Sequence, residues 1–129
     1  MIVTIQPSSI SGTIYAPASK SSMQRACAAA LLTNGETIIS NPGKSNDDLA
    51  ALDVIQKLGA TITSPGNKIS IKSNGLPSIS LSTGGEGRGE VNCGESGLGL
   101  RMFAAVAALS SQKIIWNGSG SLWKRPKNF

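Results

Sequence analysis

The sequence repeats itself at a fixed spacing, and this repeat restricts the folds open to the chain more than any other feature. When the sequence is shifted by 76 residues, a basic residue, an apolar helical segment and a short strand all find counterparts without a gap. The aligned pairs are Arg25 with Arg101, ACAAALL (26–32) with MFAAVAA (102–108), and the IIxN segments at 38–41 and 114–117. We therefore infer an internal repeat of one supersecondary unit.

The first copy of the unit reads as an alternation of strands and helices. Alternating and β-branched segments predict strands, whereas Ala/Leu-rich or regularly spaced apolar segments predict helices. The expected elements are strands at 2–6 and 12–16, a helix from Ser19 as N-cap to Leu32, a strand at 36–41, a helix at 46–58 and two strands on either side of Pro65-Gly66-Asn67. The order strand, helix, strand, helix, strand, strand predicts an α/β fold.

Both repeat helices are apolar on nearly every side, so we expect them inside the core rather than on a solvated face. Cys27, within the first of them, is expected to be a small buried thiol. The helix at 46–58 begins with a capping-box pattern at Ser45 and Asp48. Its apolar residues, expected to form one stripe, are Leu49, Leu52, Ile55 and Leu58.

The repeat divides the chain into three parts. Residues 1–11 contain a strand that we expect to belong with a domain beyond this chain, residues 12–75 form the first unit, and residues 76–129 form an incomplete second unit. By the repeat spacing, the counterpart of the second helix should begin near residue 122 and continue to about residue 134, whereas Phe129 is the last residue. We therefore expect the chain to be a fragment.

The composition narrows the possible functions. The net charge is +5, but aromatic residues make up only 4% of the chain and no run of Lys and Arg is longer than two, so nucleic acid is not expected as a partner. No apolar run approaches the length of a membrane span, and no signal peptide is visible. Because Cys27 and Cys93 are isolated, we expect a reduced, cytoplasmic protein. The chain has no histidine, so proton transfer near neutral pH would need Lys, a carboxylate or a tuned hydroxyl.

Cations stand near the start of both repeat helices, where the helix dipole is already positive. Lys20 and Arg25 lie in the first turns of the helix that follows Ser19, with no acidic residue nearby. A cation there costs about 0.3–1 kcal/mol, whereas each charge-assisted hydrogen bond to an anion gains about 1.5–3 kcal/mol. Ser21 and Arg25 are four residues apart and share one helix face. The second unit repeats this arrangement of a helix start and a cation in CGESGLGLR, which ends at Arg101. We therefore expect a small anionic ligand. For any single one of these residues, the alternative is a solvated surface cation.

These residues resemble the opening of the 5-enolpyruvylshikimate-3-phosphate synthases, and the resemblance covers essentially the whole chain in order. The matching segments are Ser19-Lys20-Ser21-x-x-x-Arg25 before an Ala/Leu helix, Asn41 at the end of a strand, Asn46-Asp47 before a helix that ends in Leu58-Gly59, Gly97 and Arg101 of an Asn-Ala-Gly-Thr-x-x-Arg motif, and Arg125-Pro126. The resemblance implies a fold of βαβαββ units, three in each of two domains, with helices inside and sheets outside.

The resemblance also implies a reaction, the transfer of the enolpyruvyl group of phosphoenolpyruvate to the 5-hydroxyl of shikimate 3-phosphate. This is a step of the shikimate pathway toward chorismate and the aromatic amino acids. The implied partners are these two small anions, with no metal or organic cofactor, no nucleic acid and no membrane, and the full-length parent is expected to be a monomer. The family's acid/base carboxylates lie late in the sequence, so we expect no catalytic residue in this chain and no transferase activity by it alone.

The family's binding roles transfer to the residues that match its motifs. The resemblance implies that Lys20 contacts both substrates and that Ser21 and Arg25 bind shikimate 3-phosphate. It also implies that Gly97 donates its backbone amide to phosphoenolpyruvate. Arg125 would contact the charge of the same substrate, with Arg101 as an auxiliary cation. All of these ligand groups are anionic, which would explain why cations stand at helix N-termini.

Several residues depart from the family pattern on the phosphoenolpyruvate side. Glu95 stands for Asn, Leu98 for Thr, Met102 for Pro and Ser121 for Arg, and Trp123 and Lys124 also differ. A carboxylate beside a phosphoenolpyruvate subsite is unfavourable unless a cation pairs with it. We therefore hypothesise that Glu95 is neutralised by Arg101 or Lys124.

Three other interpretations stay open at this point. The first is the sister enzyme that transfers enolpyruvyl to UDP-N-acetylglucosamine, whose opening motif typically has Asn where this chain has Ser21. The second is a nucleic-acid-binding or RNA-end-processing protein built on the same unit, favoured only by the basic isoelectric point. The third is a non-catalytic scaffold, which the departures at Glu95 and Ser121 keep open. Sequential binding of shikimate 3-phosphate and phosphoenolpyruvate would separate them.

Overall fold

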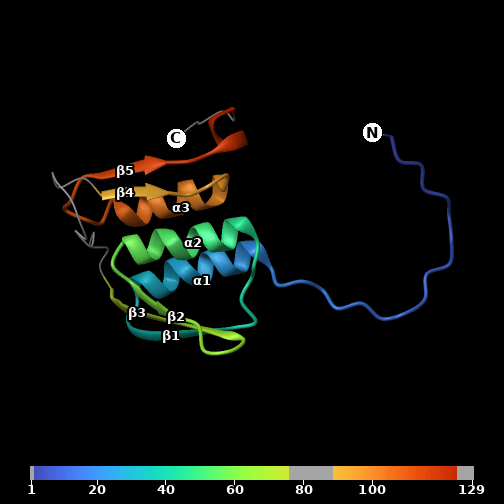
Figure 1. Ribbon diagram of the computed structural model, residues 1–129, viewed down its shortest axis with the longest axis horizontal. Helices are drawn as coiled ribbons and strands as arrows, with labels where there is room; N and C mark the ends of the chain where they lie inside the picture. Colours follow the sequence, from blue (N-terminus) through green and yellow to red (C-terminus); the bar gives the residue numbers. More distant parts are fainter. Residues whose placement is uncertain (1, 76–88, 125–129) are drawn as a thin grey trace.

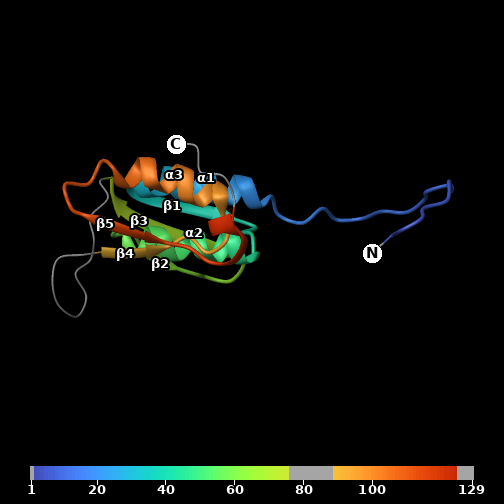
Figure 2. The same cartoon turned by 90° about the horizontal axis from the view of Figure 1, so that it is seen from above.

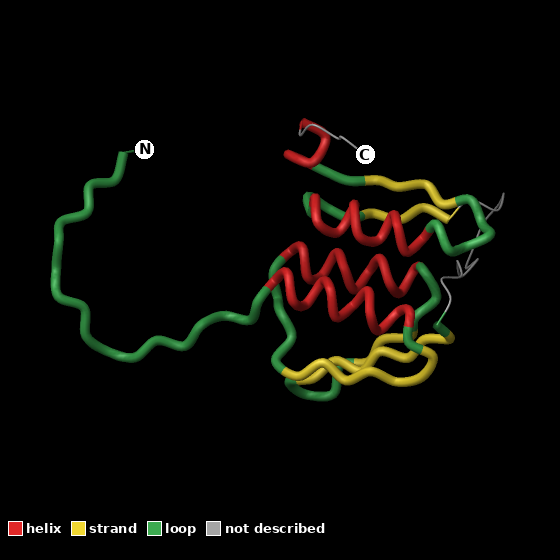
Figure 3. The backbone as a smooth tube through the Cα atoms, turned by 180° about the vertical axis from the view of Figure 1, so that it is seen from behind, coloured by secondary structure: helices red, strands yellow, loops and turns green. Residues whose placement is uncertain are grey.

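In the described part of the chain, the α-helices lie between two β-sheets (Figures 1 and 3). The computed structural model describes residues 2–75 and 89–124. The helices are α1 (Lys20–Leu32), α2 (Asn46–Lys57) and α3 (Gly97–Ala107). One sheet contains β1 (Asn34–Ser40), β2 (Thr61–Thr63) and β3 (Lys68–Asn74), the other contains β4 (Gly89–Asn92) and β5 (Ile114–Asn117), and the short 3-10 helix η1 (Gly120–Lys124) follows. The predicted layering, with helices inside and sheets outside, is confirmed.

The two sheets differ in strand direction. In the first sheet β3 is central, with β1 and β2 antiparallel on either side, so the strand pair predicted around Pro65-Gly66-Asn67 is confirmed. In the second sheet β4 and β5 are parallel, from Gly89 opposite Ile114 to Asn92 opposite Asn117. A parallel pair needs a crossover connection, and α3 supplies it. The sequence patterns did not predict β4.

Hydrogen bonds from local side chains set the starts of the helices as predicted. Ser19 caps α1, because its Oγ accepts a hydrogen bond from the Ser22 amide at 3.4 Å. α2 begins with the predicted capping box, in which the Asp48 amide donates to Ser45 Oγ at 3.3 Å and the Ser45 amide donates to Asp48 Oδ2 at 2.9 Å. Such bonds satisfy amides that a helix N-terminus leaves unpaired and are each worth about 1 kcal/mol.

The core lies where the three helices face one another and the sheets. Its fully buried side chains include Leu31, Val54, Ile55, Leu58, Ile71, Val91, Phe103 and, as predicted, Cys27. The predicted stripe on α2 is partly wrong, because Leu49 is 57% exposed whereas Ala51 and Val54 are buried. Residues three apart drift by about 60° per step around an α-helix, so four of them cannot stay on one face. The buried stripe instead alternates steps of three and four.

The helices are less enclosed than their apolar character predicts. α1 exposes Arg25, Ala29 and Leu32 on one side, and α3 exposes Arg101 and Ala105. Full burial of both repeat helices is therefore wrong for this chain, although each lies between the sheets. None of the helices in the described part of the chain has the length and hydropathy that crossing a bilayer requires.

The N-terminal segment extends away from the rest of the chain, as Figures 1 and 2 show. Residues 2–19 form neither helix nor strand, so the strands predicted at 2–6 and 12–16 are wrong for this chain. A strand needs a neighbouring strand to take its backbone hydrogen bonds, and this segment has none within the described residues. At 89–92, the counterpart of 13–16, β4 forms because β5 pairs with it. The assignment of residues 1–11 to a domain beyond this chain stays a prediction.

Candidate functional site

A hollow of about 410 Å³ lies where the N-terminal ends of α1, α2 and α3 meet. Its walls come from the first turns of α1, from the first turn of α2 and from the residues that lead into α3. The lining residues are Lys20, Ser21, Gln24, Asp47, Glu95, Ser96, Gly97 and Leu98. Each helix N-terminus carries about half a positive charge from the peptide dipoles and exposes unpaired amides, so this arrangement favours an anion.

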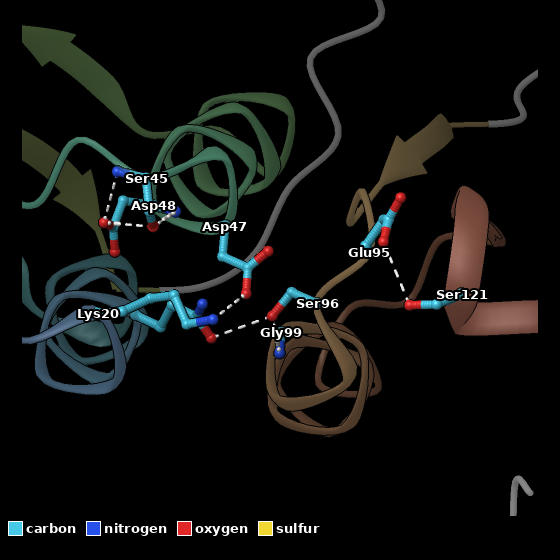
Figure 4. A network of polar contacts seen from close by, with 9 residues as sticks. Lys20, Ser45, Asp47, Asp48, Glu95, Ser96, Gly99 and Ser121 are labelled. Carbon is cyan, nitrogen blue, oxygen red and sulfur yellow. Dashed lines mark hydrogen bonds and ion pairs between the residues drawn. The ribbon is translucent and has the colours of Figure 1, made fainter. Parts of the chain in front are cut away.

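An ion pair joins the starts of α1 and α2 at the hollow (Figure 4). Lys20 Nζ lies 2.8 Å from Asp47 Oδ2, and the Lys20 side chain is 54% exposed. Water and salt therefore screen the pair, and its net contribution to stability is about 0–1 kcal/mol. An ammonium group has three donors, so Lys20 can keep Asp47 and still donate to a ligand. The sequence reasoning missed Asp47 as a site residue, although the capping box of α2 placed it at a helix N-terminus.

A buried hydrogen bond joins α1 to α3 beside the hollow. Ser96 Oγ donates to Gln24 Oε1 at 3.2 Å and accepts a hydrogen bond from the Gly99 amide at 2.9 Å. Gln24 is 1% exposed and Ser96 is 3% exposed, so removing either side chain would leave a buried polar group unpaired at a cost of about 1–3 kcal/mol. The bond thereby fixes the two helix N-termini relative to each other. No local pattern marked Gln24, because its neighbours Ser22 and Arg25 are polar as well.

Glu95 does not have the partner that the sequence reasoning gave it. Its Oε2 accepts a hydrogen bond from Ser121 Oγ at 3.1 Å, and Figure 4 shows the carboxylate turned toward Ser121. The ion pairs among the described residues are Lys20–Asp47 and Lys57–Asp53. Neutralisation of Glu95 by Arg101 or Lys124 is therefore wrong within the described residues. The sequence around Glu95 does not indicate this hydrogen bond, because Ser121 lies 26 residues further along the chain.

The structure brings together three of the six predicted binding residues. Lys20, Ser21 and Gly97 line the hollow, from two helices that are far apart in sequence. Arg25 lies more than one turn beyond the start of α1 and is exposed, and Arg101 lies about one turn beyond the start of α3 and is also exposed. Neither arginine is among the described residues that line the hollow. Arg125 lies outside the described residues.

The charges around the hollow limit how tightly this chain alone can hold an anion. Among the described lining residues, Lys20 is the only cation, whereas Asp47 and Glu95 are carboxylates. Glu95 faces Ser121 and Asp47 faces Lys20, so each has a donor of its own. The attraction for an anion therefore comes from the amides and dipoles of the helices and from the part of the Lys20 charge that Asp47 does not neutralise.

Catalysis by a thiol nucleophile and metal binding have little support in the described residues. Cys27 is fully buried, and its pKa is raised to about 12 by desolvation and, to a smaller extent, by the charge of Asp48. The Cys27 thiol is therefore protonated near neutral pH and is not an activated nucleophile. Among the described residues, no three His, Cys, Asp or Glu side chains lie close enough together to hold a metal ion.

The chain matches known proteins along nearly its whole length. The family model described as EPSP synthase (3-phosphoshikimate 1-carboxyvinyltransferase) matches residues 5–128. A solved structure titled EPSP synthase from Acinetobacter baumannii is 26% identical in sequence and superposes with a TM-score of 0.69. The match covers 89% of this chain and 25% of that one.

Curated relatives carry the name 3-phosphoshikimate 1-carboxyvinyltransferase. The relative from Chlamydia caviae is 37% identical over 122 residues, which cover 95% of this chain and 26% of the relative. The relative from Clostridium perfringens strain SM101 is 33% identical over 124 residues, covering 96% of this chain and 28% of the relative. The relative from Methanocorpusculum labreanum is 33% identical over 126 residues, covering 98% and 29%. The chain thus spans about a quarter of the length of these relatives.

Proposed function

The chain belongs to the EPSP synthase family, and on this basis we propose that it is part of an enzyme that transfers the enolpyruvyl group of phosphoenolpyruvate to shikimate 3-phosphate. The observation that carries this proposal is the hollow at three helix N-termini, where Lys20, Ser21 and Gly97 come together. Both substrates are small anions, which is the kind of ligand that such a hollow favours. We also propose that the protein is cytoplasmic.

In this proposal α1 provides the shikimate 3-phosphate side of the site. Lys20 donates to both substrates while it keeps its ion pair with Asp47, and Ser21 donates its hydroxyl to the shikimate 3-phosphate. Arg25 contacts the same substrate from the rim, since it lies one turn beyond Ser21 on the same helix face. The Asp47 pair holds the flexible Lys20 side chain near the reacting atoms, so less entropy is lost when the ligand binds.

The start of α3 provides the phosphoenolpyruvate side. Gly97 is the first residue of α3, so its amide has no partner within the helix and is free to donate to a phosphate or carboxylate. Arg101 and Arg125 supply further positive charge to this substrate. We assign no catalytic acid or base to this chain. Since the described lining side chains carry one positive and two negative charges, the chain alone is expected to bind these anions weakly and to have no transferase activity.

The proposal can be tested by NMR titration of the 129-residue chain with shikimate 3-phosphate, with phosphoenolpyruvate, and with unphosphorylated shikimate as the control ligand. The amides of Ser21 and Gly97 should shift with the two phosphorylated ligands, with a dissociation constant of about 1 mM or weaker. Lys20→Ala should weaken the binding of shikimate 3-phosphate about fivefold or more.

Lys57→Ala is the matched control for this test. It also removes a partly exposed lysine from an ion pair, that with Asp53 at 2.9 Å, but it lies at the other end of α2 and should leave the titration unchanged. Equal effects of both variants, or shifts that do not depend on the phosphate, would contradict the site. Phosphate release from the two substrates by the purified chain would contradict the expected inactivity.

A further inference from the structure

Two positions at which the sequence departs from the family pattern contact each other. Ser121 Oγ donates to Glu95 Oε2 at 3.1 Å, which links the turn before α3 to η1 (Figure 4). Glu95 stands where the pattern has Asn, and Ser121 stands where it has Arg. The two departures therefore form one structural pair rather than two separate losses.

The backbone around this pair is shaped to receive the Glu95 carboxylate. Gly120 has a φ of +53°, and a Cβ at this position would collide with Glu95 Oε1. Glycine is therefore the residue that lets the carboxylate lie against the start of η1. Two backbone hydrogen bonds join the same segments, from the Ser119 amide to the Gly94 carbonyl at 2.9 Å and from the Cys93 amide to the Asn117 carbonyl at 3.0 Å.

Glu95 also lies inside the turn that leads into α3. The Ser96 amide donates to the Cys93 carbonyl at 3.1 Å across this turn, and Gly94 has a φ of +58°. Ser96 is the N-cap of α3, and Gly97 is the first residue of the helix. A displacement of Glu95 would therefore displace the Gly97 amide, which lies two residues away on the wall of the hollow.

We propose that Glu95 is a positioning residue whose carboxylate, held by Ser121 and lying against Gly120, fixes the turn before α3 and so directs the Gly97 amide into the hollow. This role rests on the proposed function only in naming phosphoenolpyruvate as the anion that the amide meets. The bond to Ser121 has a charged acceptor, which makes it stronger than a bond between neutral groups. Glu95 also lines the hollow, but its carboxylate is engaged with η1, so in this proposal it acts on the anion through the Gly97 amide.

The test is a double-mutant cycle on Glu95→Ala and Ser121→Ala, with hydrogen exchange of the Ser96 amide, which donates to the Cys93 carbonyl across the turn, as a readout that needs no ligand. Each single variant should speed exchange about threefold or more, and the double variant should exchange no faster than the faster single variant. Glu95→Gln keeps an acceptor oxygen for Ser121, so it should stay within about twofold of the unsubstituted chain. Additive effects of the two alanine variants, or a Glu95→Gln variant as impaired as Glu95→Ala, would overturn the proposal.

Ligand titration of the same variants separates positioning from a general loss of structure. Glu95→Ala should weaken phosphoenolpyruvate binding about threefold or more while leaving shikimate 3-phosphate binding within about twofold. Glu36→Ala is the matched control, because Glu36 is an exposed glutamate that accepts a hydrogen bond from a serine, Ser70, on the distant sheet. Tighter phosphoenolpyruvate binding by Glu95→Gln would show direct repulsion and would also overturn the proposal. If the unsubstituted chain binds neither anion, the proposed function fails, while the exchange cycle still decides the role of Glu95.

Discussion

Raising the pH should destabilise the chain through Cys27. This thiol is fully buried, and burial, with a smaller contribution from the charge of Asp48, raises its pKa from 9.0 to about 12. The unfolded thiol ionises at its ordinary pKa, so the contribution of Cys27 to stability is fully present below about pH 9 and is lost as the pH rises toward about 12. Each pKa unit corresponds to about 1.4 kcal/mol, so raising the pH from about 8 to about 11 should cost about 2–3 kcal/mol through this group.

The assay is urea unfolding at both pH values for the unsubstituted chain and for Cys27→Ala. All other side chains are the same in both proteins, so the difference between the two pH dependences isolates Cys27. The alanine variant loses packing at both pH values and should lose about 2–3 kcal/mol less on going to high pH. Equal losses in the two proteins would refute the reasoning.

Two further predictions concern packing. A Cβ at Gly43 would lie 2.6 Å from Asp48 Cγ, and Asp48 is buried and held by Ser45. Gly43→Ala should therefore lower the free energy of unfolding, measured by urea denaturation, by about 1–3 kcal/mol. An unchanged unfolding midpoint would contradict this prediction. Phe103 of α3 is fully buried, so Phe103→Ala should cost about 3–5 kcal/mol in the same assay, and a cost below about 1 kcal/mol would mean that α3 does not pack as described.

The sequence predicted those parts of the fold that depend on local interactions. Ser19 and Ser45 mark the starts of α1 and α2, because a serine cap acts on amides two or three residues away. Strands depend on a partner that lies elsewhere in the chain. Residues 12–16 have the composition of a strand but no neighbour among the described residues, whereas 89–92 form β4 beside β5. Composition alone does not separate these two cases.

The site was predictable where a residue's role follows from its helix position. Lys20, Ser21 and Gly97 stand at helix N-termini, and the three line one hollow, while their binding roles stay a prediction. The missed contacts join elements that are distant in sequence, such as the bond from Ser96 on α3 to Gln24 on α1. The partner of Glu95 was predicted wrongly because charge alone favoured Arg101 or Lys124. The packing of η1 against the turn before α3 decided in favour of the Ser121 hydroxyl.

The common orientation of α1, α2 and α3 has a consequence for the stability of the helix layer. Their N-terminal ends meet at one hollow, so their partial positive charges repel one another there, and the carboxylates of Asp47 and Glu95 offset this repulsion only in part. A bound anion removes this repulsion and therefore stabilises the helix layer as well as occupying the site. Buffers that contain phosphate or sulfate should accordingly raise the melting temperature, and the chain should be most fragile in solutions whose anions are too large to enter.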